Sequence, residues 1–339
     1  MLFIKTKHLP KSAKMDLQKR ALYNSLRMNW LLDPTLQVAS WQVENYREMS
    51  LPLILGYLEK YQLNFTKESF SVFAEEFDSP EELADELLSE LNLTPEDEDR
   101  AYLLIFELWR RIETDKPCLS VFCDELDHQI FLYDRRQTQN TEDIEDAISN
   151  LQVILNQNTD GGGDPIEILK SVNKGCANDI ETFLYDFTNE QIENLNYSYA
   201  TELIDSFIEF VSDTKWFDLL QVRILQNMDR EGADTLMQQL FEEAQSDEDL
   251  QFNLELLYEI IQKDDPETFL QLLDNTAGLL EVEEDFLDFL VICIDYCSRN
   301  DREKEEKILR TIGESRNHDL SAPLKKNDPD LLILLNTVR

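Results

Sequence analysis

Histidine and glycine are scarce in this chain of 339 residues, which contains 3 of the first and 8 of the second. Histidine is the side chain that enzymes use most often as a general base, and it is the commonest metal ligand. The sequence contains no G-x-S-x-G nucleophile motif and no clear Cys–His pair. Its 70 acidic residues bring carboxylates together by chance, so acidic pairs do not indicate catalysis. We therefore expect a protein that is not an enzyme, with a helical enzyme whose site escapes recognition as an alternative.

The low glycine content also bears on the fold, because sheets and loops use glycine at positive φ whereas helix interiors disfavour it. Hydrophobic residues make up 42% of the chain, enough for a substantial core. In the segment DLQFNLELLYEIIQ, the apolar Leu250, Leu254 and Leu257 fall on one face of a helix. No segment alternates apolar and polar side chains over the length of a β-strand. These patterns predict an all-α fold.

Long apolar runs are missing as well. The tightest apolar cluster, FLVICI at 289–294, is far shorter than the ~20 residues of a membrane-spanning helix. No apolar core of a secretory signal follows the first residues. The five cysteines are an odd number in a large chain, unlike the disulfide framework of a small secreted protein. We expect a cytoplasmic protein without a membrane span, and no motif points to a cofactor.

Positive charge is scarce over most of the chain. The net charge is −39, but residues 1–29 carry seven Lys or Arg against one acid, so the remainder carries −45. Residues 231–298 contain nineteen acids and a single base, Lys263, and we expect these acids to lack local partners. Such a body repels phosphate backbones and anionic membranes. We expect no direct binding of nucleic acid and a protein partner with a basic surface; the alternative is that the acids only keep the protein soluble.

The basic start of the chain allows two interpretations. One is an organellar targeting segment, although such segments are richer in arginine and serine. The other is a first helix that lies against the acidic body, docked by an apolar stripe of Met15, Leu22, Leu26 and Trp30.

Proline follows a capping residue at six positions, often with acids after it. This order places a side-chain acceptor at the N-cap, proline at the first helical position and negative charge near the positive end of the helix dipole. We therefore predict helix starts at Asp33-Pro34, Ser79-Pro80, Thr94-Pro95, Asp164-Pro165, Asp265-Pro266 and Asp328-Pro329.

A coarse repeat runs through the C-terminal half. First helices are predicted about 35 residues apart, near Ser198, Ala233, Pro266 and Arg302, and second helices near Trp216, Glu248 and Glu283. Hairpins at this period are typical of an α-solenoid. The small residues of the tetratricopeptide (TPR) pattern are missing, so an irregular, looser stack of the HEAT kind fits better. The alternative is an irregular helical bundle.

Breaks in the helical pattern divide the chain into three predicted regions. An N-terminal helical region with the basic first helix spans 1–138, and an acidic helical-repeat region spans 141–316. A link and a short C-terminal helix span 317–339. No pattern indicates the oligomeric state.

A glycine-rich stretch, NQNTDGGGDPIEIL at 156–169, is close to the calcium loop of an EF-hand. The candidates for ligand positions one, three, five, nine and twelve are Asn156, Asn158, Asp160, Asp164 and Glu167. Against calcium binding, asparagine replaces the usual aspartate at position one, Gly163 stands where an aliphatic anchor is usual, and no second loop of this kind exists. We therefore expect a connector between two helices rather than a metal site.

Together these features predict a non-enzymatic protein–protein interaction module, such as a scaffold, an adaptor or a chaperone-like binder. Its acidic surface would receive a basic or amphipathic partner. A calcium-regulated helical binding protein that uses residues 156–167 is the second interpretation.

Overall fold

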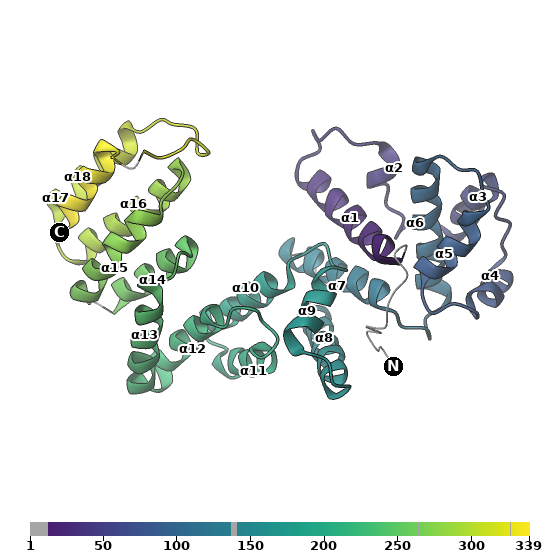
Figure 1. Cartoon of the computed structure of the whole chain (residues 1–339), viewed down its shortest axis with the longest axis horizontal. Coiled ribbons are helices and arrows are strands. Elements are labelled where there is room, and N and C mark those ends of the chain that lie inside the picture. The colour runs from purple at the N-terminus through teal and green to yellow at the C-terminus, as the bar shows by residue number, and fades with distance from the viewer. Residues whose placement is uncertain (1–12, 137–140, 264, 326) are drawn as a thin grey trace. The chain divides into compact units, whose positions relative to one another are not determined.

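The computed structural model describes residues 13–136, 141–263, 265–325 and 327–339, with side chains from residue 18 onward. Within these ranges every regular element is a helix, α1 to α18, which confirms the predicted all-α fold (Figure 1). In the described part of the chain, no helix combines the length and the apolar character that crossing a membrane requires.

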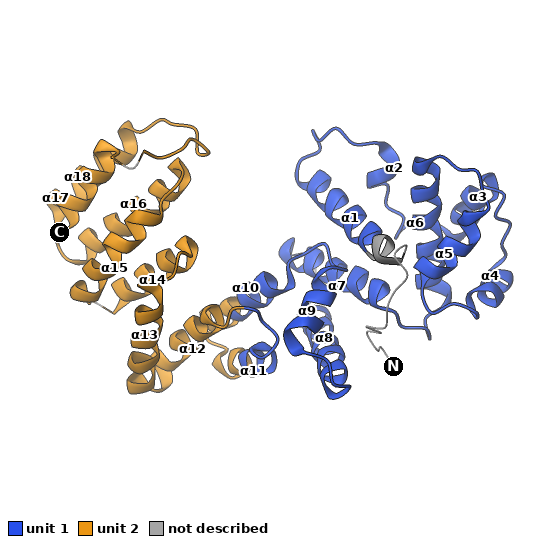
Figure 2. Cartoon of the chain, viewed as in Figure 1, with its two compact units in different colours: residues 1–188, 202–212 blue, residues 189–201, 213–339 orange. Residues whose placement is uncertain are grey.

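The chain divides into two compact units, which Figure 2 shows in separate colours. Unit 1 comprises residues 1–188 and 202–212, and unit 2 comprises residues 189–201 and 213–339. Two helices contribute residues to both units, α10 (Ile180–Glu193) and α11 (Tyr197–Phe207). The three regions expected from composition stay a prediction.

Unit 1 begins as an irregular bundle around one buried helix. Its complete helices are α1 (Ala13–Leu32), α2 (Ser40–Val43), α3 (Leu51–Lys60), α4 (Lys67–Ala74), α5 (Pro80–Ser89), α6 (Pro95–Ile112), α7 (Leu119–Asp134), α8 (Glu142–Asp160) and α9 (Pro165–Asn173). The sequence of α6 is apolar nearly all round, and every residue from Ala101 to Trp109 is buried. α3, α4 and α5 pack on α6 and cover these side chains.

The basic first helix, α1, is docked within unit 1, where it packs against α2, α5 and α7. The prediction of its inward face is wrong. Arg20 and Tyr23 are buried, whereas Leu22 is 67% exposed. α1 turns this polar face inward because Arg20 pairs with Asp124, a buried carboxylate on α7. The other members of the predicted stripe are the half-buried Leu26 and Trp30, and Met15, whose side chain lies outside the described part.

Unit 2 consists largely of helices that pack in consecutive pairs. They are α12 (Lys215–Met228), α13 (Arg230–Ala244), α14 (Leu250–Gln262), α15 (Pro266–Leu279), α16 (Glu283–Arg299), α17 (Glu303–Ser315) and α18 (Pro329–Val338). α12 packs with α13, α14 with α15 and α16 with α17, and α14 also packs on α16. Each pair joins the second helix of one predicted repeat to the first helix of the next. This part agrees with the predicted stack of hairpins, whereas the packing around α6 agrees with the bundle.

Five of the six predicted proline starts are confirmed. At α5, α6, α9, α15 and α18 the residue before proline is the N-cap, and its side chain accepts a hydrogen bond from a backbone N–H of the first turn. The prediction at Asp33-Pro34 is wrong, because α1 ends at Leu32 and α2 begins only at Ser40. Asp33 instead accepts hydrogen bonds from the backbone N–H and the hydroxyl of Thr35. The same side chain that caps a helix can thus stabilise a turn.

The glycine-rich stretch ends α8 and leads into α9. Gly162 has a φ of 90°, and its N–H donates to the carbonyl of Thr159 at 2.8 Å. The N–H of Gly163 donates to the carbonyl of Asn158 at 3.1 Å. These two bonds form a Schellman motif, which closes a helix through a residue in the left-handed region. A Cβ on Gly163 would lie 2.8 Å from the side chain of Ile168, so glycine also permits the close approach of α9.

The segment between α17 and α18 lies against the start of α16. The N–H of Glu283 donates to the carbonyl of Ala322 at 2.9 Å. The buried guanidinium of Arg316 pairs with three carboxylates, those of Glu283, Asp328 and Asp330. One cation therefore joins the end of α17 to the starts of α16 and α18.

We expect Gly162→Ala to lower the free energy of unfolding by about 1 kcal/mol, because an alanine is strained at positive φ. Gly56→Ala in the interior of α3 is the matched control, since its added Cβ meets open space. That control should raise the free energy of unfolding by up to about 1 kcal/mol, because alanine favours the helix. Urea unfolding followed by circular dichroism measures both changes, and equal changes in the two variants would contradict the left-handed turn.

Candidate functional site

The five candidate calcium ligands do not come from a single loop. Those of α8 are Asn156, Asn158 and Asp160, and those at the start of α9 are Asp164 and Glu167. The amide of Asn158 is buried and donates to a carbonyl of its own helix at 2.7 Å. Asp164 caps α9, and Glu167 pairs with Lys170 at 3.1 Å. An EF-hand loop directs its oxygens inward from between two helices, so the end of α8 would have to unwind. The expectation that this stretch is no calcium site stays a prediction.

The stretch of residues 231–298 forms part of α13 to α16, and most of its acids are exposed. Some of them have no ion pair with any described residue. These unpaired, exposed acids of the stretch are Glu231, Glu242 and Glu243 on α13, Glu248 before α14, Asp265 and Glu267 at the start of α15, and Glu281, Glu284 and Asp288 at the start of α16. We refer to them below as the acidic surface.

The expectation that the acids of residues 231–298 lack partners is wrong for several of them. Lysine and arginine residues from outside residues 231–298 form ion pairs with acids of this stretch. Lys215 on α12 lies 2.5 Å from Asp247, and Arg223 lies 2.6 Å from Glu259. A count along the sequence cannot find these partners, because they come from another helix. Two further pairs of this kind are Arg316 with Glu283 and Arg339 with Asp274.

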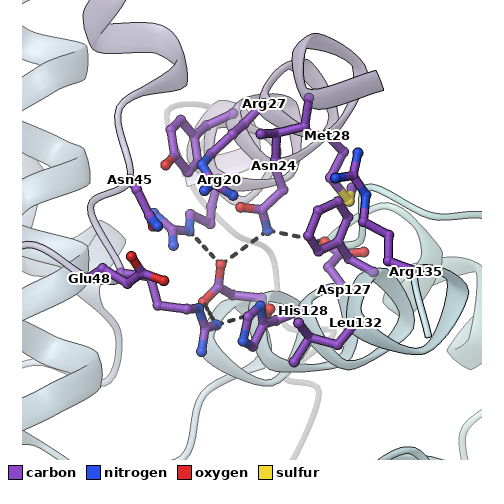
Figure 3. A pocket seen from close by; sticks show the side chains of 15 residues that line it. Arg20, Asn24, Arg27, Met28, Asn45, Glu48, Asp127, His128, Leu132 and Arg135 are labelled. Atoms are coloured by element: carbon purple, nitrogen blue, oxygen red, sulfur yellow. Dashed lines mark hydrogen bonds and ion pairs between the residues drawn. The ribbon is translucent and has the colours of Figure 1, made fainter. Parts of the chain in front are cut away.

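A cavity of about 280 Å³ lies within unit 1, between α1, α7 and the segment before α3 (Figure 3). Four arginines line it: Arg20, Arg27, Arg47 and Arg135. Arginine stays protonated at physiological pH and is a hydrogen-bond donor only, so these groups can bind an anion but cannot transfer a proton. We call this cavity the arginine pocket.

Asp124 on α7 is the centre of the ion pairs at the base of the arginine pocket. One of its oxygens lies 2.7 Å from Nε of Arg20, and the other lies 2.6 Å from Nη2 of Arg47. The amide of Asn24 donates to the first oxygen at 3.1 Å (Figure 3). Burial alone would raise the pKa of Asp124, but the charges of Arg20 and Arg47 outweigh burial and lower that pKa to about 2. An ionised Asp124 therefore joins α1 and the segment before α3 to α7.

Asp127 lies one turn further along α7 and joins the pocket to the segment between α9 and α10. Its carboxylate accepts hydrogen bonds from the backbone N–H groups of Ala177 and Asn178, at 2.8 to 3.1 Å. Burial raises the pKa of Asp127 to about 6 in spite of these donors. Burial, followed by the charge of Arg47, lowers the pKa of His128 below its usual value. His128 is therefore a neutral imidazole at pH 7.

Sequence reasoning missed the arginine pocket, although one signal was present. Arg20, Asn24 and Arg27 are spaced as one face of a helix. A polar face in a basic segment is usually exposed to solvent. The partner that buries Arg20 lies 104 residues further along the chain, where a local pattern cannot reveal it.

A second buried carboxyl in unit 1, Glu81 on α5, pairs with no cation among the described residues. Its oxygens accept hydrogen bonds from the hydroxyls of Tyr102 and Ser120, at 2.8 and 3.0 Å. Burial raises the pKa of Glu81 to about 7, although both hydroxyls act to lower it. The folded protein thus holds a proton that the unfolded chain releases near pH 4.5.

We expect Arg20→Gln to lower the free energy of unfolding by about 3 kcal/mol, because it leaves a buried carboxylate with one cation fewer. Lys19→Gln is the matched control, because Lys19 is the next cation on α1 and pairs with the half-exposed Glu98 and Asp99. Such exposed pairs contribute less than about 1 kcal/mol to the free energy of unfolding. Urea unfolding measures both variants. Similar losses in the two would contradict a structural role for the Arg20–Asp124 pair.

We expect Glu81 to make the free energy of unfolding fall as the pH rises from about 5 to about 7, and to have no further effect above that. The unfolded state binds fewer protons than the folded state in this window, so stability decreases with pH, at most by about 1.4 kcal/mol per pH unit. Glu81→Gln removes this titration, whereas Glu86→Gln, at an exposed position of α5, retains it. Urea unfolding measures the free energy of unfolding of each protein across the pH range. If the difference in this free energy between wild type and Glu81→Gln does not change with pH, the raised pKa is contradicted.

In comparisons with known proteins, this chain matches no family model, no curated protein and no solved structure. Its function has to be argued from its own residues.

Proposed function

We propose that this chain is a non-enzymatic protein-interaction module, acting as a scaffold, an adaptor or a chaperone-like binder. The acidic surface of unit 2 would receive a basic or amphipathic segment of a partner protein. The observation that carries this proposal is the set of exposed carboxylates on α13, α15 and α16 that have no ion pair with a described residue.

The pairing inside unit 2 supports this proposal. Two cations of the unit are already engaged by several carboxylates each: Lys215 lies within 3.1 Å of three aspartates, and Arg316 pairs with three acids. The carboxylates of the acidic surface repel one another without such a cation, and this repulsion opposes folding. A partner that brings lysine or arginine relieves the repulsion, which gives the surface a preference for basic partners.

Electrostatic attraction of this kind acts mainly on the rate of association. The field of exposed charges extends about one Debye length, ~8 Å at physiological salt. It steers a basic partner towards the surface and repels acidic ones, while adding less to the intrinsic affinity.

The five cysteines are free thiols and buried, and a reducing compartment such as the cytoplasm is the proposed location.

We expect a partner captured with the full chain from its native host, and identified by mass spectrometry, to be basic at its contact surface. Its association rate should fall at least about tenfold from low to physiological salt, since steering is screened by ions. Stopped-flow fluorescence measures this rate. An acidic partner, or a rate that ignores salt, would contradict the proposal.

Two variants of equal net charge test where the partner binds. The first neutralises unpaired acids around the start of α16: Glu281→Gln, Glu284→Gln and Asp288→Asn. The second neutralises exposed acids of unit 1: Glu75→Gln, Glu76→Gln and Glu90→Gln. Only the first variant should slow association severalfold, and equal slowing in both would assign the effect to net charge rather than to the acidic surface.

A further inference from the structure

The arginine pocket is lined by more arginines than carboxylates, and not every arginine forms an ion pair with a carboxylate of the protein. Asp124 is bonded to Arg20 and Arg47. The two remaining arginines, Arg27 and Arg135, form no ion pair with any described residue, although acids outnumber bases by 70 to 31 in the chain. Arg135 contacts only the ring face of Phe131, at 4.7 Å from its centre, among the interactions resolved for its guanidinium.

Two buried N–H donors in the same pocket have no acceptor within the described part of the chain. They are Nη1 of Arg20 and Nε of Arg27. Arg20 is only 2% exposed, so water cannot readily serve its donor. A buried donor without an acceptor costs about 1–3 kcal/mol, and such groups are rare in folded proteins. Both donors belong to side chains that line the pocket, but the two atoms themselves have almost no accessible surface. A bound acceptor would reach them only if these arginine side chains shift toward it.

The carboxylates that line the pocket do not fill this role. Asp127 uses its oxygens to accept from Ala177 and Asn178. Glu48 lies at the rim, is exposed to water and forms no ion pair with a described residue. Water screens its charge strongly. Two further carboxylates lie next to the pocket arginines, since Glu107 is 3.9 Å from Arg20 and Glu125 is 2.8 Å from Arg47. Neither forms an ion pair with Arg27 or Arg135, which are the cations of the pocket that remain unpaired among the described residues.

We infer that the arginine pocket binds a small molecule that carries a phosphate group. Arg27 and Arg135 offer two unpaired positive charges to a phosphate monoester, whose charge is between −1.5 and −2 at pH 7, while Asp127 and Glu48 offset part of this attraction. The planar donors of arginine fit phosphate oxygens in pairs. A cavity of about 280 Å³ is at the small end of ligand pockets, so the ligand is a compact molecule rather than a polymer.

The residues of this site have distinct roles. Arg27 on α1 and Arg135 after α7 pair with the phosphate, and Arg20 adds positive charge at the base. Neutral His128 on α7 is a further donor (Figure 3). The ligand therefore joins α1 to the end of α7. Because α1 is the helix that carries the basic start of the chain, the ligand stabilises its docking in unit 1. This site is separate from the proposed acidic surface and does not depend on it.

The test is titration calorimetry of the full chain with inorganic phosphate and glycerol phosphate, at constant ionic strength and a pH at which both are dianions. Succinate serves as a dianion without a phosphate group. We expect one site for the phosphate compounds and at least tenfold weaker binding of succinate. Equal binding of succinate would overturn the assignment to phosphate, and no binding of any probe would overturn the site.

Variants locate the binding. The double variant Arg27→Gln with Arg135→Gln should bind phosphate at least about tenfold more weakly, since each removes a charge-assisted hydrogen bond. Lys60→Gln with Lys67→Gln removes the same net charge from exposed positions of unit 1 and should change the affinity less than twofold. Glu48→Gln should tighten binding. Equal weakening in the two double variants would show general attraction to charge and overturn the inference.

Nuclear magnetic resonance of the histidine rings tests the site independently of calorimetry. The chain has three histidines, so the ring signals of His128 can be identified by comparison with His128→Gln. Phosphate in the pocket should shift these signals and raise the pKa of His128. Signals of His128 that ignore saturating phosphate would overturn the inference even if calorimetry detects binding elsewhere.

Discussion

The packing of this protein depends on where its few cations lie. With 70 acids against 31 lysines and arginines, carboxylates meet at several contacts between helices, and at some of these contacts a cation lies between them. In unit 2 the ammonium group of Lys215 lies between three aspartates, at 2.5 to 3.1 Å. Arg316 joins three segments in the same way. Removing one partner of a buried ion pair such as Arg316–Glu283 costs several kcal/mol, so this cation contributes to the packing of the helices that it joins.

Signals that act within one turn of helix were readable from the sequence. Proline after a capping residue located five helix starts, because both groups act on the backbone next to them. The apolar run in α6 is a local signal of the same kind, because a helix that is apolar on nearly every face is buried. Asp33 shows the limit of such signals: its carboxylate can accept from Thr35 in a turn as readily as from the first turn of a helix.

Pairings between distant segments could not be read in the same way. The sequence shows a basic α1 and an acidic chain, but not which carboxylate meets which arginine. Asp124 looks like one acid among many, and only the fold brings Arg20 and Arg47 to its two oxygens. The inward face of α1 was mispredicted for this reason. A polar side chain with buried partners on α7 can displace an apolar stripe, since the buried charges would otherwise be unpaired.

Excess charge has different consequences in a pocket and on a surface. Around Asp124 the arginines are buried or half-buried, so a donor without an acceptor is costly there and favours a group that satisfies it. The carboxylates on α13 and α16 are hydrated, so each costs little by itself, and together they act through a field that salt weakens. A site of the first kind selects a ligand by donor geometry, and a surface of the second kind selects a partner by the sign of its charge. The two excesses are thus the basis of the two proposed recognition properties, one short-range and one long-range, in the same chain.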